Sequence, residues 1–169
     1  PAPAVRFGSI SRDTDILLDE QAAVGRCELN LPASLSVPAL LSGPDQRSFY
    51  LGTPPEQRPA ALAMMQSVML RLLTTMPPGQ VKFTLIDPIG LGESFGGFMH
   101  LADHEESLVN GRVWSEPAHI DRRLTDLTDH MGQMIQKYLR NDYDSIDQYN
   151  EQAGELAEPY RFLVAADYP

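Results

Sequence analysis

The chain has 169 residues, of which 43 % are hydrophobic and 21 % are charged, and its formal net charge at pH 7 is −10. This composition is typical of one globular domain with its own core, and no apolar run approaches the ~20 residues that a membrane-spanning helix needs. The acidic balance disfavours direct binding of nucleic acids, because their phosphate backbones are also negative. The single cysteine, Cys27, cannot form an internal disulfide, and we therefore expect a reducing, cytoplasmic setting.

The first 47 residues are predicted to hold one short strand and little other regular structure. Val5–Ile10 alternates apolar and other residues as a strand does. In the stretch from Ser11 to Gln46, the residues Pro32, Pro38 and Pro44 are expected to block long elements. We therefore divide the chain into a strand with an irregular connection, residues 1–47, and a main domain, residues 48–169.

The main domain begins with a pattern of strand, helix and strand. Ser48–Leu51 is predicted to be a short buried strand, and a loop follows from Gly52. The helix after this loop places apolar residues at spacings of three and four, namely Leu62, Met65, Met69 and Leu72. Val81–Pro88 is apolar on both faces, as in a strand of a parallel sheet that is covered on both sides. The order predicts a right-handed βαβ unit.

The second half of the chain continues the alternation. Gly90–Gly97 is glycine-rich and is predicted to be a flexible loop. A long helix, capped by Ser115, carries an apolar stripe at spacings of four and three, made of Ile120, Leu124, Leu127, Met131, Met134 and Tyr138. A short helix is expected from Ser145, and Pro159–Pro169 contains a last apolar strand. The predicted fold class is therefore α/β, a mostly parallel sheet flanked by helices.

Two groups of polar residues are weighed as sites. Asp87 follows a buried strand and is either a ligand at the carboxyl end of the sheet or the cap of a turn. His100 and His104 stand four apart, but they lie in a loop region, so we interpret them as solvated residues and predict no metal site.

The order of these motifs resembles the motor domain of the FtsK/SpoIIIE family, hexameric ATP-driven DNA translocases whose relatives include secretion ATPases. "VKFTLIDP" (Val81–Pro88) is similar to the strand that follows the phosphate-loop helix of that family, and "FMHL" (Phe98–Leu101) to its Pro-His-Leu turn. "HMGQMIQKYLRNDYDSIDQYNEQ" (His130–Gln152) resembles its long helix, loop and Tyr-Asn segment, and "PYRFLVAADYP" (Pro159–Pro169) its strand ending in Asp-Glu. The resemblance implies a RecA-like P-loop NTPase core, incomplete at the C-terminus, with ATP and Mg²⁺ as cofactors.

The same resemblance places Gly52, Thr53 and Arg58 in the phosphate loop, with Arg58 at the position of the family's lysine. Gln57 replaces the last glycine and Pro59 the Ser/Thr that binds Mg²⁺. Pro54, Pro55 and Pro59 each lack the N–H group that a phosphate cradle uses.

In the last strand, the metal-holding Asp of the family falls on Ala166 and its catalytic Glu on Asp167. With a shift of one residue, Asp167 takes the metal role instead. These departures remove most of the chemistry of the family from this chain.

The resemblance implies two hypotheses, and the residues leave a third open. The first is a degenerate FtsK/SpoIIIE-like module, with Gly52, Thr53, Arg58 and Asp87 in a remnant nucleotide site and Asp167 in a remnant catalytic position. Its expected partners are other ATPase domains or further copies of itself, and DNA only through partners or further segments. The second is an active ATPase protomer that uses Arg58 in the phosphate loop. The third is an unrelated α/β binding domain.

Overall fold

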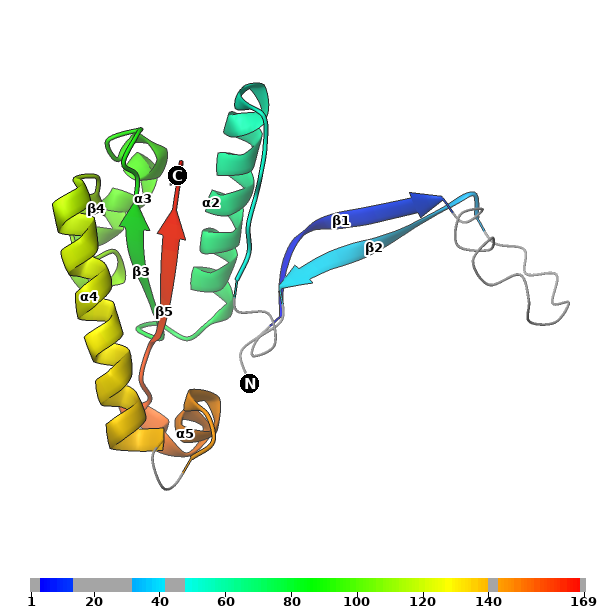
Figure 1. Ribbon diagram of the computed structural model, residues 1–169. Coiled ribbons are helices and arrows are strands. Elements are labelled where there is room, and N and C mark those ends of the chain that lie inside the picture. Colours follow the sequence, from blue (N-terminus) through cyan, green and yellow to red (C-terminus); the bar gives the residue numbers. More distant parts are fainter. Residues whose placement is uncertain (1–3, 14–31, 42–47, 140–142, 168–169) are drawn as a thin grey trace, which may run out of the picture.

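The computed structural model describes residues 4–13, 32–41, 48–139 and 143–167, and its fold is mixed α/β. A three-layer body carries a projecting hairpin of β1 (Val5–Asp13) and β2 (Ser34–Leu41) (Figure 1). The strands of the body are β3 (Val81–Ile86), β4 (Val113–Trp114) and β5 (Tyr160–Ala165). Its helices are η1 (Pro55–Gln57), α2 (Arg58–Thr75), η2 (Glu93–Phe95), α3 (Gly96–Met99), η3 (His100–Asp103), η4 (Glu106–Leu108), α4 (Pro117–Met134), the π-helical turn η5 (Ile135–Leu139), α5 (Ile146–Ala153) and η6 (Gly154–Leu156).

The central layer is a parallel sheet with the strand order β4-β3-β5. β3 pairs with β5 along its whole length, from Val81 opposite Tyr160 to Ile86 opposite Ala165. β4 adds only two residues on the other side of β3. The prediction of a parallel sheet with Val81–Ile86 next to the last strand is confirmed.

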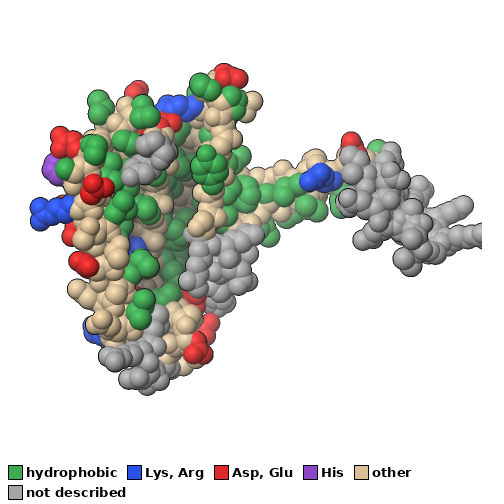
Figure 2. Space-filling view, in the orientation of Figure 1, with side chains coloured by type: hydrophobic (Ala, Val, Ile, Leu, Met, Phe, Trp, Pro, Cys, Tyr) green, Lys and Arg blue, Asp and Glu red, His purple; other side chains and the backbone are tan. Residues whose placement is uncertain are grey.

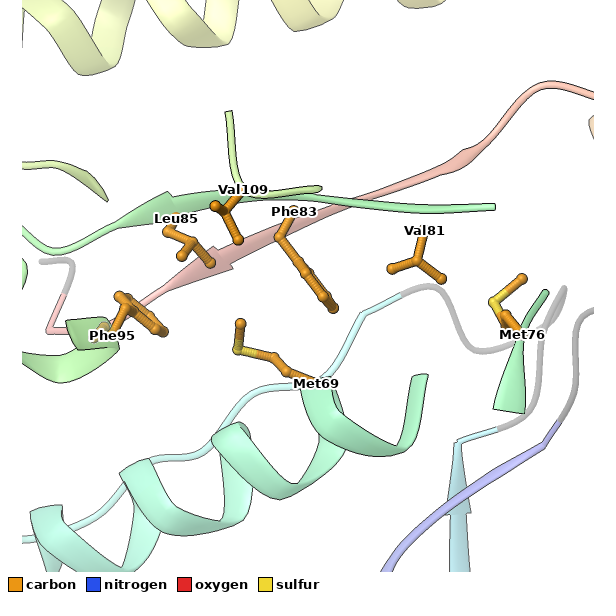
Figure 3. Close-up of a cluster of buried hydrophobic side chains, with 8 residues drawn as sticks. Met69, Met76, Val81, Phe83, Leu85, Phe95 and Val109 are labelled. Atoms are coloured by element: carbon orange, nitrogen blue, oxygen red, sulfur yellow. The ribbon is translucent and has the colours of Figure 1, made fainter. Parts of the chain in front are cut away.

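The main core lies between the sheet and α2 (Figure 3). Alternate side chains of β3, namely Val81, Phe83 and Leu85, point toward α2, where Met69 is almost fully buried. β5 contributes Phe162, whose ring lies 5.8 Å from the ring of Phe83. The predicted spacing of apolar residues on this helix therefore does identify the face that packs on the sheet.

The opposite face of the sheet is covered by α4, but less completely. Ile120 is buried at 2 % exposure, whereas Met131 further along the same stripe is 61 % exposed. The predicted stripe is thus right in its first half and wrong at Met131. The helix begins at Pro117 with Glu116 as its N-cap, one residue after the predicted cap at Ser115.

The residues Ser48–Leu51 do not form the predicted strand. They are extended but unpaired, and Phe49 is 37 % exposed while Tyr50 is 89 % exposed. Phe49 packs its ring against Phe7 of the hairpin, with 4.6 Å between centroids. β3 already has a neighbour on both of its edges, so this segment finds no position beside it.

The predicted irregular connection in residues 1–47 is also wrong in part. β2 pairs antiparallel with β1, and Pro38 lies opposite Ser9 within the ladder. A two-stranded sheet has an open side on each strand, where a residue without an N–H group costs little. Pro44 lies outside the described residues. Hydrophobic side chains cover much of this hairpin in Figure 2, and Ile10, Leu35, Val37 and Leu40 are each 44–50 % exposed.

The loop predicted to be flexible is instead a series of short helical turns, η2, α3 and η3. Phe95 is fully buried in its first turn. Gly92 adopts a φ of 94°, which residues with a side chain rarely reach, and it supplies the bend before η2. His100 and His104 are exposed, which agrees with their interpretation as solvated residues.

None of the helices in the described ranges combines the length and the apolarity that a membrane crossing requires.

Candidate functional site

The carboxyl ends of β3 and β5 bring together three of the residues singled out from the sequence. Arg58 is the first residue of α2, Asp87 directly follows β3, and Asp167 lies two residues after β5. The amino end of α2 and the carboxyl ends of both strands lie at the same end of the body (Figure 1). In open α/β folds this edge is where ligands bind.

Arg58 is held by Asp167 in this arrangement. Its Nε donates to Oδ2 of Asp167 over 2.7 Å, and its Nη2 donates to the same oxygen. Nη2 also donates to Oγ of Ser94 at 3.1 Å. Hydrogen bonding to Asp167 raises the pKa of Arg58, and the same contact lowers the pKa of Asp167. The cation that would face a phosphate is therefore neutralised by a carboxylate of its own chain.

The backbone of Asp167 is part of this contact. Its φ is 51°, in the left-handed region that Asp enters more readily than most residues. Directly before it, Ala166 is buried and its N–H donates to the carbonyl of Ile86 at 2.9 Å. β5 thus stays tied to β3 up to Ala166, and the chain then turns so that the next side chain meets Arg58.

Asp87 is fully buried and acts as a cap for the following turn. Its carboxylate accepts hydrogen bonds from the backbone N–H groups of Gly90, Gly92 and Ser94, at 2.8, 3.2 and 3.1 Å. A side chain at Gly90 would put its Cβ 2.7 Å from the carboxylate, so only glycine fits there. Both carboxylate oxygens are occupied within the chain, which favours the turn-capping interpretation over that of a free ligand.

Gly52 and Thr53 are not brought into the cluster. They lie in the extended segment before η1, and within the described residues neither forms a hydrogen bond with Arg58, Asp87 or Asp167. The ring of Tyr50 lies against Gly52, where an added Cβ would be 3.1 Å from Cε1 of the tyrosine.

The loop before α2 does not offer the donors of a phosphate cradle. Pro54 and Pro55 lack an N–H group, and the N–H of Gln57 already donates to the carbonyl of Pro54 at 3.0 Å. Pro59 stands where a hydroxyl would be needed for Mg²⁺. In the described part of the chain, no group of three or more His, Cys, Asp or Glu side chains is arranged to hold a metal. The residues present do not fit MgATP in the manner of a P-loop.

The sequence analysis did not identify two residues of this cluster, Ser94 and Gln66. Ser94 is buried and receives Arg58 on its hydroxyl, while its carbonyl accepts a hydrogen bond from Nε2 of Gln66 at 2.8 Å. The only signal for Ser94 was its place in the glycine-rich segment that we interpreted as a flexible loop. Gln66 and Ser67 are the two polar residues of an otherwise apolar helical turn, Met64–Val68, and such an exception can mark a buried partner.

Comparisons with protein-family models, with curated proteins and with solved structures each found no match to this chain.

Proposed function

We propose that this chain is a non-hydrolysing module of the FtsK/SpoIIIE type with a RecA-like core. The observation that carries the proposal is the pairing of Arg58 with Asp167 at the amino end of α2. In a working motor the cation at this position holds the phosphates, and the acid after the last strand serves Mg²⁺ or the attacking water. Here the two side chains are bound to each other.

The module acts as a structural or regulatory part of a larger cytoplasmic ATP-driven motor that moves DNA or secreted protein. The helix α2 is followed by the buried strand β3, as the resemblance implies, although Ser48–Leu51 adds no strand before it. Contacts within the chain take the place of the ligand chemistry. Such a domain contributes surfaces to active neighbours and makes no use of ATP or Mg²⁺ itself. Its partners are other ATPase domains or further copies of itself, and DNA is reached through them.

The alternative is an active protomer in which Arg58 leaves Asp167 and binds the phosphates of ATP. One observation favours it: the Arg58 side chain is 40 % exposed, so it is accessible from solvent. An unrelated α/β binding domain is the third possibility, and it would need neither residue for its function.

A thermal-shift and turnover experiment separates the non-hydrolysing module from the active protomer. Ligand at 100 times its Kd stabilises a protein by about 2.7 kcal/mol, so binding of ordinary affinity is visible. We expect no MgATP-dependent rise in Tm and no turnover above background. A MgATP-dependent shift that is lost in Arg58→Ala and kept in Arg71→Ala, an exposed arginine on the same helix, would overturn the proposal in favour of the active protomer.

A second variant tests whether the ion pair itself blocks the site. Asp167→Asn removes the carboxylate charge and keeps its shape, so Arg58 gains freedom to meet an anion. If pairing is the block, this variant acquires a small ATP-dependent shift that the parent chain lacks. If the missing donors of the loop matter more, neither protein responds.

A further inference from the structure

A cationic cleft lies on the opposite side of the sheet from α2, between β4 and the first half of α4. It has a volume of about 320 Å³ and is lined by Arg112, Trp114, His119, Arg122, Arg123 and Asp126. Three guanidinium groups face one carboxylate there, which leaves an excess of two positive charges. His119 is paired with Glu116 at 3.0 Å. This concentration of charge stands in a chain whose net charge is −10.

The hydrogen-bond donors of the cleft exceed its acceptors. Within the described residues, Arg112 and Arg122 form no hydrogen bond or ion pair, although the Arg112 guanidinium stacks 3.8 Å over the ring of Trp114. Nε1 of Trp114 and Nε of Arg123 are buried with no hydrogen-bond partner in the described structure. Buried donors are almost always satisfied, and an exception needs a physical account.

Arg123 is the member that ties the cleft to the sheet. Its Nη2 donates to Oγ1 of Thr84 on β3 at 3.3 Å. Burial lowers the pKa of Arg123, Asp126 acts in the opposite sense, and Arg161 adds to the lowering. The positive charge of Arg123 is thus desolvated and close to a second cation, with one carboxylate to offset both.

We propose that this cleft binds the phosphomonoester group of a small molecule. A phosphomonoester carries a charge of about −1.5 to −2 at pH 7 and three strong acceptor oxygens, which match the two excess charges and the exposed guanidinium groups of Arg112 and Arg122. Arginine forks suit the oxygens of phosphate in particular. The volume is at the lower end of ordinary ligand sites, about 300–1,000 Å³. The site shares no residue with the Arg58–Asp167 cluster and does not depend on the proposed function.

Trp114 makes the test direct, because it is the only tryptophan in the chain. Its fluorescence is followed while the whole chain is titrated with inorganic phosphate and, separately, with glycerol 2-phosphate, at constant ionic strength set with chloride. We expect a saturable change with at least one of them. Saturation by both ligands shows that the phosphate group alone is enough for binding. Saturation by glycerol 2-phosphate alone shows that the organic part of the ligand contributes to binding.

Matched arginine variants locate the binding. Arg122→Gln removes an exposed lining charge with little risk to folding, and the affinity should fall about tenfold or more, the usual effect of losing one charge-assisted hydrogen bond. Arg71→Gln, an exposed arginine on α2, should bind as the parent chain does. The proposal is overturned if neither phosphate gives saturation, if both variants lose affinity equally, or if only a DNA oligonucleotide gives an Arg122-dependent response.

Discussion

At the scale of single residues, the cluster at the carboxyl edge of the sheet is organised by two acids with different tasks. Asp87 is buried and satisfies backbone donors, whereas Asp167 is partly exposed and satisfies a side-chain cation. The sequence identified both residues because each follows an apolar strand. It could not assign the tasks, because these depend on which N–H groups the following turn presents.

The Arg58–Asp167 pair predicts a specific dependence of stability on pH. Arg58 lowers the folded-state pKa of Asp167, so the pair contributes stability that is complete above the unfolded pKa of the acid, near its ordinary value of 3.8. That contribution is lost as pH falls through the lower, folded-state pKa. Arg58→Gln should therefore unfold at lower urea than the parent chain at pH 7, and the two midpoints should converge in strong acid. Midpoints that stay equally separated at both pH values would contradict the pairing.

Asp87→Ala tests the buried cap. It leaves three backbone N–H groups without their acceptor, and an unsatisfied buried donor costs about 1–3 kcal/mol. We expect a loss of about 3 kcal/mol or more in the free energy of unfolding, measured by urea denaturation. Asp103→Ala is the control, because its carboxylate is 74 % exposed, and it should change stability by less than about 0.5 kcal/mol. Equal effects of the two variants would remove Asp87 from its structural role.

At the scale of elements, the sequence predicted those that are long and periodic. The sequence analysis located α2, β3, α4 and β5. Each of these elements buries apolar residues, and the spacing of those residues along the chain indicates the element. β2 was missed because its Pro38 is an ordinary signal against a strand, and only the partner strand shows that the position tolerates it. The segment Ser48–Leu51 was overpredicted because a short apolar run does not show what it packs against. Phe49 packs on Phe7 of the hairpin, and the segment does not pair with the sheet.

The two halves of α4 should differ in their importance for folding. Ile120 is 2 % exposed and lies against the sheet, so Ile120→Ala should cost about 2–5 kcal/mol through lost burial and the cavity that remains. Met131 belongs to the same sequence stripe but is 61 % exposed, so Met131→Ala should change the free energy of unfolding by less than about 0.5 kcal/mol. Urea denaturation of both variants measures the difference. Comparable losses would mean that the whole stripe is buried.

At the scale of the whole molecule, the candidate sites lie on two sides of one thin sheet. The Arg58–Asp167 cluster joins α2 to the carboxyl ends of the strands, and the arginine cleft lies under α4. The sequence pointed toward the first site, since the family resemblance singled out both Arg58 and Asp167. It did not reveal the second, because Trp114 lies on a two-residue strand, Arg112 directly precedes that strand and Arg123 lies on a helix, and only the fold brings them together.

The sheet also has an open edge, strand β5, at which another strand can pair. In the described part of the chain, β5 is paired only with β3, so the N–H and C=O groups on its other side have no strand partner. Leu163 on this strand is 51 % exposed. In Figure 2 hydrophobic side chains gather in the hollow between α2 and α4, the region through which β5 runs in Figure 1. An open edge with apolar neighbours is a template for pairing with another strand.

We therefore predict that the chain associates with further copies of itself through β5. Leu163→Lys places a charge on the edge strand, a device that natural sheets use against such pairing, and it should shift sedimentation or light-scattering profiles toward the monomer. Leu70→Lys is the matched control, since Leu70 is 57 % exposed on α2, outside the edge strand, and the same charge is introduced there. A parent chain that remains monomeric at high concentration would contradict the prediction, as would an equal shift in both variants. The second result would show that net charge, which each variant makes less negative by one, governs the association in place of the strand edge.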